Sequence, residues 1–283
     1  MIEYHKIIQP KKEFDLPTFR HEDIGMKGIN GEPFVVMDDH IGLTEKQWEE
    51  IDYEIGIGIA TNETAIPGGI VFGEIPPKLV NEVGGLLEPQ IMNNIESLDP
   101  DGRHRDAMRK MTRHQRQKYA YMVLGSVPIW HQLIYIRNYN MPNSKCGTYD
   151  AEWTDEGKKL FPKTIEFMKS MPMEYIGRVL IFCSYPSYPV PPHRDWIQSP
   201  HRDHHINFTS KKNRPIYMYD EIKNEKYYLD PNARSYLFNL RDYHGVDGYP
   251  RYAYTLKIEG MFDKSLQEKL NLKEGFLWTP EVI

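Results

Sequence analysis

A succession of short strand-like segments fills the C-terminal half of the chain, and this pattern limits the folds that are open to it. Each segment is rich in β-branched and aromatic residues, and residues typical of turns separate one segment from the next. Several short strands joined by turns favour an antiparallel sandwich or barrel. The segments lie at residues 178–183, 215–219, 226–229, 235–240 and 252–258.

Two helices are indicated outside these segments. Thr44 and Gln47 have the spacing of a capping box, which predicts a helix that begins there and ends near Gly56. A second helix is expected to begin at Pro162, because proline is tolerated in a first helical turn, and to end before Pro172. Helices and strands are therefore both expected, with strands predominating.

This pattern predicts an α+β chain, mainly β, with an α-containing N-terminal region at 1–150 and a β-rich region at 151–283, as two domains or one. The 283 residues include 19 Tyr and 11 Phe, which argues against disorder, because disordered chains hold few aromatic residues.

A net charge of −5 excludes a globally basic nucleic-acid binder. The stretch 103–118 nevertheless has seven basic residues against one acid. A solvated helix face is its simplest explanation, and a docking surface for an acidic or nucleic-acid partner is the alternative.

Cysteine content and apolar patterning indicate the compartment. Only two cysteines are present, Cys146 and Cys183, which is too few for a disulfide framework and typical of a reducing environment. No apolar run approaches the ~18 residues that a membrane span needs, and the N-terminal segment lacks the apolar core of a secretory signal. We therefore expect a cytoplasmic protein that does not cross a membrane.

Histidine is concentrated in one part of the chain: four of the eleven histidines lie within residues 193–205, which contain two His-x-Asp triplets. In an extended segment, residues i and i+2 project from the same face, so His193 and Asp195 can converge on one metal ion. His244 lies 51 residues after His193 in another turn-like segment and is the natural third ligand. Two histidines and one carboxylate on one side of an octahedron suit Fe(II) oxygenases.

The second triplet, with His201 and Asp203, is the alternative metal-binding pair. It stands directly before the next strand-like segment, 204–208. The first triplet instead follows the strand at 178–183 at a turn, where a ligand at the rim of a sheet is expected. We therefore prefer the first triplet.

Other functions could also explain these residues. His-Arg-Asp also begins the catalytic loop of protein kinases, but there an asparagine follows the aspartate by five positions, and Asn207 follows Asp203 by four. No Gly-rich loop or Asp-Phe-Gly motif accompanies the triplets, so a kinase is excluded. A zinc-dependent hydrolase remains open, with His201, His204 and His205 as ligands and a bound water as nucleophile. So does a jelly-roll binding or structural protein without turnover.

Residues 161–195 resemble the aspartyl/asparaginyl β-hydroxylase-like branch of the 2-oxoglutarate/Fe(II) oxygenases. The shared order is a helix, Met-Pro, Gly-Arg, an apolar strand, a turn and Pro-Pro-His-x-Asp, and the run onward to His244 is similar to the family's distal His-x-Val. The similarity covers residues 160–260. It implies a double-stranded β-helix (a cupin-like jelly roll) with iron at one mouth, held by His193, Asp195 and His244.

The resemblance also implies the reaction and its cosubstrates. With Fe(II), 2-oxoglutarate and O2, such an enzyme hydroxylates an unactivated C–H bond of an amino acid, a protein side chain or a related small molecule, and releases succinate and CO2. The family's basic residue for the distal carboxylate of 2-oxoglutarate corresponds best to Arg251, seven positions after His244, with Lys257 as the second candidate. Arg202 lies one position from another basic residue of the family and is a further candidate contact to cosubstrate or substrate.

Overall fold

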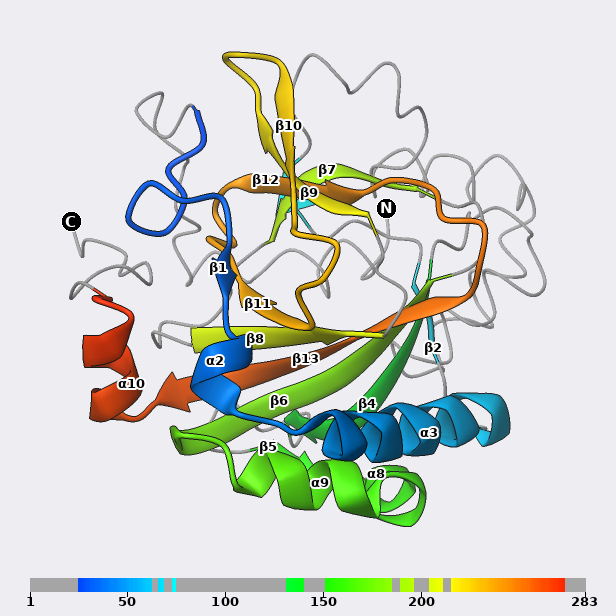
Figure 1. The fold of residues 1–283 in the computed structure, drawn as a ribbon. Helices are drawn as coiled ribbons and strands as arrows, with labels where there is room; N and C mark the ends of the chain where they lie inside the picture. The colour runs from blue at the N-terminus through cyan, green and yellow to red at the C-terminus, as the bar shows by residue number, and fades with distance from the viewer. Residues whose placement is uncertain are drawn as a thin grey trace, which may run out of the picture.

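The computed structural model describes residues 25–62, 66–68, 73–74, 131–139, 151–184, 189–195, 204–210 and 215–272. Within them, two antiparallel β-sheets form separate layers, and helices cover the outer face of the larger one (Figure 1). The basic stretch at 103–118 lies outside the described residues.

The larger sheet has the strand order β1-β11-β8-β13-β6-β4-β2, and β5 pairs with β4. Its longest strands, β13 and β6, lie at its centre, and their pairing extends along most of both strands. The strands are β1 (Val35–Val36), β2 (Ile66–Gly68), β4 (His131–Tyr139), β5 (Ala151–Trp153), β6 (Met173–Ser184), β8 (His204–Thr209), β11 (Ser235–Leu237) and β13 (Ala253–Phe262).

The smaller sheet has the order β10-β9-β12-β7-β3. From β6 to β13 the chain crosses repeatedly between the two sheets: β6, β8, β11 and β13 belong to the larger sheet, while β7, β9, β10 and β12 belong to the smaller. The strands of the smaller sheet are β3 (Gly73–Glu74), β7 (Val190–Asp195), β9 (Ile216–Asp220), β10 (Glu225–Tyr228) and β12 (Tyr243–Val246).

The five strand-like segments first given form strands, in β6, β9, β10, β11 and β13, and the segment 204–208 forms β8. The structure thus confirms a mainly antiparallel β architecture. The helices are α2 (Asp38–Ile41), α3 (Glu45–Thr61), α8 (Asp155–Leu160), α9 (Pro162–Lys169) and α10 (Lys264–Lys269). In the part of the chain that the structure describes, no helix is long and apolar enough to cross a membrane.

The helix at Thr44 has the predicted capping box: Gln47 N–H donates to Thr44 Oγ1 at 3.3 Å, and Thr44 N–H donates to Gln47 Oε1 at 2.9 Å. The expectation that this helix ends near Gly56 is wrong, because α3 continues to Thr61. The next glycine, Gly58, allows close packing, since a Cβ there would lie 2.2 Å from Cε1 of Phe161.

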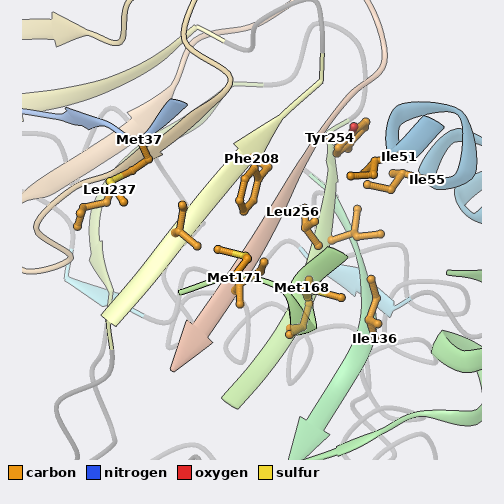
Figure 2. Close-up of a cluster of buried hydrophobic side chains, with 14 of the residues drawn as sticks. Met37, Ile51, Ile55, Ile136, Met168, Met171, Phe208, Leu237, Tyr254 and Leu256 are labelled. Atoms are coloured by element: carbon orange, nitrogen blue, oxygen red, sulfur yellow. The ribbon is translucent and has the colours of Figure 1, made fainter. Parts of the chain in front are cut away.

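The main hydrophobic core lies between the larger sheet and the helices α3 and α9 (Figure 2). Phe208 of β8 lies near its centre, with its ring centroid 5.3 Å from that of Trp48 and 5.4 Å from that of Phe167. This core contains Ile55 from α3 together with Ile181 from β6. Residues from both sides of position 150 therefore share one core.

The N-terminus of α9 is capped by a side chain from α3. Glu54 accepts hydrogen bonds from the backbone N–H of Lys163 (2.9 Å), the backbone N–H of Thr164 (2.7 Å) and the hydroxyl of Thr164 (2.6 Å). A carboxylate at a helix N-terminus pairs with otherwise unsatisfied N–H groups and with the positive end of the helix dipole. Glu54 thereby joins two helices that are far apart in the sequence.

Replacing Glu54 by alanine is expected to lower the free energy of unfolding by about 2 kcal/mol, because a side-chain cap and its hydrogen bonds are lost together. Urea unfolding monitored by circular dichroism measures this difference. Glu50→Ala is the matched control, since it removes only an exposed ion pair to Lys163 at 3.4 Å and is expected to cost less than about 1 kcal/mol. Equal losses in the two variants would contradict the capping role.

Candidate metal centre

His193 and His244 face each other on neighbouring strands of the smaller sheet. His193 lies on β7 and His244 on β12, directly opposite in the antiparallel pairing. Their ring centroids are 4.5 Å apart, at an interplanar angle of 49°. Because residues directly opposite on paired strands share one face of a sheet, the fold brings these two imidazoles together across 51 residues of sequence.

The ring of His244 has a defined orientation. Its Nδ1 lies 3.1 Å from the backbone carbonyl oxygen of Asp242. A carbonyl can only accept, so Nδ1 carries the proton, and Nε2 is the nitrogen whose lone pair can bind a metal. Such a hydrogen bond from the non-ligating nitrogen is the usual support of a metal-binding histidine. The ring of Phe238, with its centroid 4.6 Å away, packs against the same imidazole.

The segment before β12 is itself anchored by Asp242. Its carboxylate accepts hydrogen bonds from the backbone N–H groups of Lys27 (3.0 Å) and Gly28 (2.6 Å). Burial raises the pKa of Asp242 above its ordinary value, although these two hydrogen bonds oppose the shift. Gly28 has a φ of +62°, and a Cβ there would lie 2.3 Å from the carbonyl oxygen of Glu32, so glycine is required. The turn at Gly28 therefore helps to position the carbonyl that holds His244.

The third predicted ligand, Asp195, is the last residue of β7, where its backbone pairs with Gly73 of β3. Its side chain lies outside the described residues, as do His201, Arg202 and Asp203 in full. Among the side chains that the structure describes, no group of three or more His, Cys, Asp or Glu could hold a metal ion. The described part of the candidate site is therefore the histidine pair, and all three ligand assignments stay predictions.

His204 and His205 lie next to each other on β8 and project to opposite faces of the larger sheet. His204 stacks on Phe262 with centroids 4.6 Å apart and an interplanar angle of 3°, and its Nδ1 accepts a hydrogen bond from the Phe262 N–H at 2.9 Å. His205 packs against Phe238, with a centroid distance of 5.0 Å. Two side chains on opposite faces cannot bind the same ion, so the zinc site that combines them does not form.

Acid is expected to destabilise the fold through His204. Burial lowers its pKa from 6.5 to about 4. Between these pH values His204 binds a proton in the unfolded chain but not in the folded one. The free energy of unfolding therefore falls as the pH falls from 6.5 to about 4. The full loss is about 3 kcal/mol, from about 1.4 kcal/mol for each pKa unit.

The variant His204→Asn isolates this contribution, because an amide oxygen can accept the hydrogen bond from Phe262 but does not titrate in this range. Urea unfolding of the wild type and the variant at several pH values measures it. The variant is expected to be the less stable protein at neutral pH and to lose less stability on acidification. Parallel pH profiles for the two proteins would contradict a buried, neutral His204.

The face of the larger sheet that is turned away from the helices is polar. On β8 and β13, apolar residues such as Ile206 and Leu256 belong to the helix-side core, and the positions between them face the other way. His205 on this face contacts Phe238, which in turn contacts His244, so the face is directed toward the smaller sheet. Its buried polar residues are His205, Asn207 and Thr209 of β8 and Thr255, Lys257 and Glu259 of β13.

The two candidate anchors for a carboxylate differ in placement. Arg251 is exposed in the bend that precedes β13. Lys257 is 5% exposed, on the polar face of β13, directly opposite Asn207 of β8. Its Nζ lies 3.4 Å from Oε1 of Glu259. A buried ammonium group thus lies on the face of the sheet that is turned toward the histidine pair.

Three buried polar atoms belong to strands of the larger sheet: Nδ2 of Asn207 and Oγ1 of Thr209 on β8, and Oγ of Ser184 at the end of β6. None of them has a hydrogen-bond partner within the described part of the chain. Buried polar atoms in folded proteins are almost always paired, with protein, water or a ligand. Asn207 lies directly opposite Lys257, so its amide and the ammonium of Lys257 could bind the same anion.

The polar face could have been predicted more fully from the sequence. Residues 205–209 and 254–259 alternate between polar and apolar side chains, which is the pattern of strands with two unlike faces. This alternation places Lys257 and Glu259 on one face, opposite the core. The pairing of Glu259 with Arg178, by contrast, depends on the register of β13 and β6 and has no local signal.

No family model matches the chain, and no curated protein sequence matches it significantly. Solved structures resemble its fold in part. A prolyl hydroxylase from Trichoplax adhaerens, in complex with a peptide fragment of the hypoxia inducible factor oxygen degradation domain, is 11% identical over 87% of this chain and 90% of its own, with a TM-score of 0.40. A 2OG-Fe(II) oxygenase family oxidoreductase from Burkholderia pseudomallei is 7% identical over 47% and 68%, with a TM-score of 0.33. A prolyl-4-hydroxylase from Pseudomonas putida is 12% identical over 61% and 87%, with a TM-score of 0.28. Likenesses at this level leave the chemistry to be derived from the chain's own side chains.

Proposed function

We propose that this chain is an Fe(II)- and 2-oxoglutarate-dependent dioxygenase that hydroxylates an unactivated C–H bond of an amino acid, a protein side chain or a related small molecule. The observation that carries the proposal is the pair of imidazoles of His193 and His244, 4.5 Å apart between centroids on adjacent strands. The orientation of the His244 ring by the Asp242 carbonyl supports it, because it directs a nitrogen lone pair to a ligand.

The fold that we propose is a double-stranded β-helix, or jelly roll. The order in which the chain visits the two sheets supports it: β6 to β13 alternate between the larger and smaller sheet, interrupted only by the hairpin of β9 and β10, and place four strands in each. In such a fold, β7 and β12 are neighbours in the smaller sheet. His193, Asp195 and His244 would then hold the metal from two adjacent strands.

For the distal carboxylate of 2-oxoglutarate we propose Lys257 in place of Arg251. Lys257 is buried on the inner face, whereas Arg251 is exposed outside the strand. The hydroxyl of Thr209 and the amide of Asn207 can donate hydrogen bonds to the same carboxylate. A buried cation with neutral donors beside it is a suitable site for a carboxylate, because the anion is paired and fully hydrogen-bonded.

Iron, when bound, supplies the oxygen activation that couples decarboxylation of 2-oxoglutarate to hydroxylation of the substrate, with succinate and CO2 as coproducts. The residues of the chain have the remaining tasks. The imidazoles of His193 and His244 and the carboxylate of Asp195 would hold the metal. Lys257 orients the cosubstrate.

Anaerobic titration of the metal-free protein with Fe(II) and then with 2-oxoglutarate tests this function. A weak visible charge-transfer band that needs both additions and disappears when oxygen is admitted is the expected result. Tight zinc binding, indifferent to 2-oxoglutarate and without such a band, would indicate a hydrolase instead. Failure to bind either metal would leave a binding or structural protein.

A further inference from the structure

Glu259 lies between two cations on the inner face of the larger sheet. Arg178 of β6 binds it through two hydrogen bonds, from Nε to Oε2 at 2.8 Å and from a terminal nitrogen to Oε1 at 2.6 Å. Lys257, two residues earlier on β13, brings Nζ to 3.4 Å from the same Oε1. The side chains of Glu259 and Lys257 are 9% and 7% exposed, and that of Arg178 is 33% exposed.

This carboxylate has no task in the chemistry proposed above, yet it contacts the residue that would bind the cosubstrate. A buried lysine needs a counter-ion, because an unpaired charge in the interior is costly. Glu259 provides that counter-ion in the protein described here. A cosubstrate carboxylate bound at Lys257 would then lie within a few ångströms of a second negative charge, in a region of low dielectric where like charges repel strongly.

We propose that the carboxylate of Glu259 competes with the distal carboxylate of the cosubstrate for Lys257. This competition weakens the binding of the cosubstrate and keeps it reversible. Arg178 moderates the competition, because it shares the negative charge of Glu259 and holds the carboxylate by two hydrogen bonds. This inference rests on the proposed function and deepens it. It assigns Glu259 and Arg178 as positioning residues that set the affinity for 2-oxoglutarate.

The inference also concerns selectivity. Lys257 already has a carboxylate partner, so a ligand gains from this residue only if it brings a carboxylate of its own. A 2-oxo acid without a distal carboxylate gains nothing there, whereas 2-oxoglutarate does. The side chains of Asn207, Thr209 and Ser184 are uncharged, so they do not repel a bound carboxylate.

The experiment is calorimetric titration of 2-oxoglutarate into Mn(II)-loaded protein, for the wild type, Glu259→Gln and Arg178→Gln. Mn(II) replaces Fe(II) so that binding is measured without turnover. Glu259→Gln is expected to bind 2-oxoglutarate about tenfold more tightly, because the repulsion is removed. Arg178→Gln is expected to bind it about tenfold more weakly, because Glu259 then pairs with Lys257 alone.

Opposite changes in the affinity of the two variants for 2-oxoglutarate distinguish competition from a purely structural role. In a structural role, both variants would lose affinity. If Glu259→Gln binds 2-oxoglutarate as the wild type does, or more weakly, the inference is overturned. The proposed function still stands in that case, provided that the wild type binds 2-oxoglutarate. If Glu259→Gln does not fold, Arg178→Gln decides, and unchanged or tighter binding overturns the inference. Failure of the wild type to bind 2-oxoglutarate at any concentration overturns the proposed function, and the inference with it.

Discussion

Replacing His193 or His244 by alanine is expected to abolish tight Fe(II) binding and, with it, turnover. Each substitution removes one of three proposed protein ligands, and loss of even an outer-shell partner of a metal ligand costs about 10–100-fold in affinity. We therefore expect at least a ~100-fold rise in the dissociation constant for either variant. Anaerobic titration with Fe(II) measures this rise, and circular dichroism establishes that the variants are folded.

Asp195→Ala should have the same effect, since a carboxylate is the third ligand of such a site. His201→Ala is the matched control from the second His-x-Asp triplet and is expected to retain most of the wild type's metal affinity. If His201→Ala loses metal binding and His193→Ala retains it, the assignment of the first triplet as the metal-binding pair is wrong. The ligands would then have to come from the second triplet.

The strands and the histidine pair could be predicted because their signals are local or depend only on order along the chain. Turn residues between apolar segments indicate β6 and β9 directly. His193 and His244 are expected in turns next to strands, but the structure has them within β7 and β12, and the pairing of these two strands brings them together. Their ring centroids are 4.5 Å apart in the structure.

Other features depend on packing and register and have no local signal. A glycine usually weakens a helix, so Gly56 indicated its end, but α3 continues because Gly58 permits contact with Phe161. The length of the connection from β12 to β13 determines which basic residue enters the sheet. Spacing along the sequence favours Arg251. The alternation of residues 254–259 puts Lys257 on the polar face, but only the register of β13 against β8 places it opposite Asn207.

Lys257→Met is expected to eliminate measurable binding of 2-oxoglutarate, at least ~100-fold weaker than the wild type, and to leave metal binding unchanged. Methionine has a similar volume and no charge, so the anion loses its ion pair in a buried place where that interaction is strongest. Glu259 retains its two hydrogen bonds from Arg178 in this variant, so no buried carboxylate is left unpaired. The variant should therefore fold.

Arg251→Ala is the control that separates the two candidate anchors. Arg251 is exposed in the bend before β13, where water screens its charge, so its removal is expected to change the dissociation constant for 2-oxoglutarate by less than about threefold. Calorimetric titration into Mn(II)-loaded protein measures both variants. Lys257→Arg retains the charge and should recover part of the affinity that Lys257→Met loses. If Arg251→Ala loses binding and Lys257→Met keeps it, the cosubstrate is anchored from the bend before β13, and the buried ammonium of Lys257 serves only as the partner of Glu259.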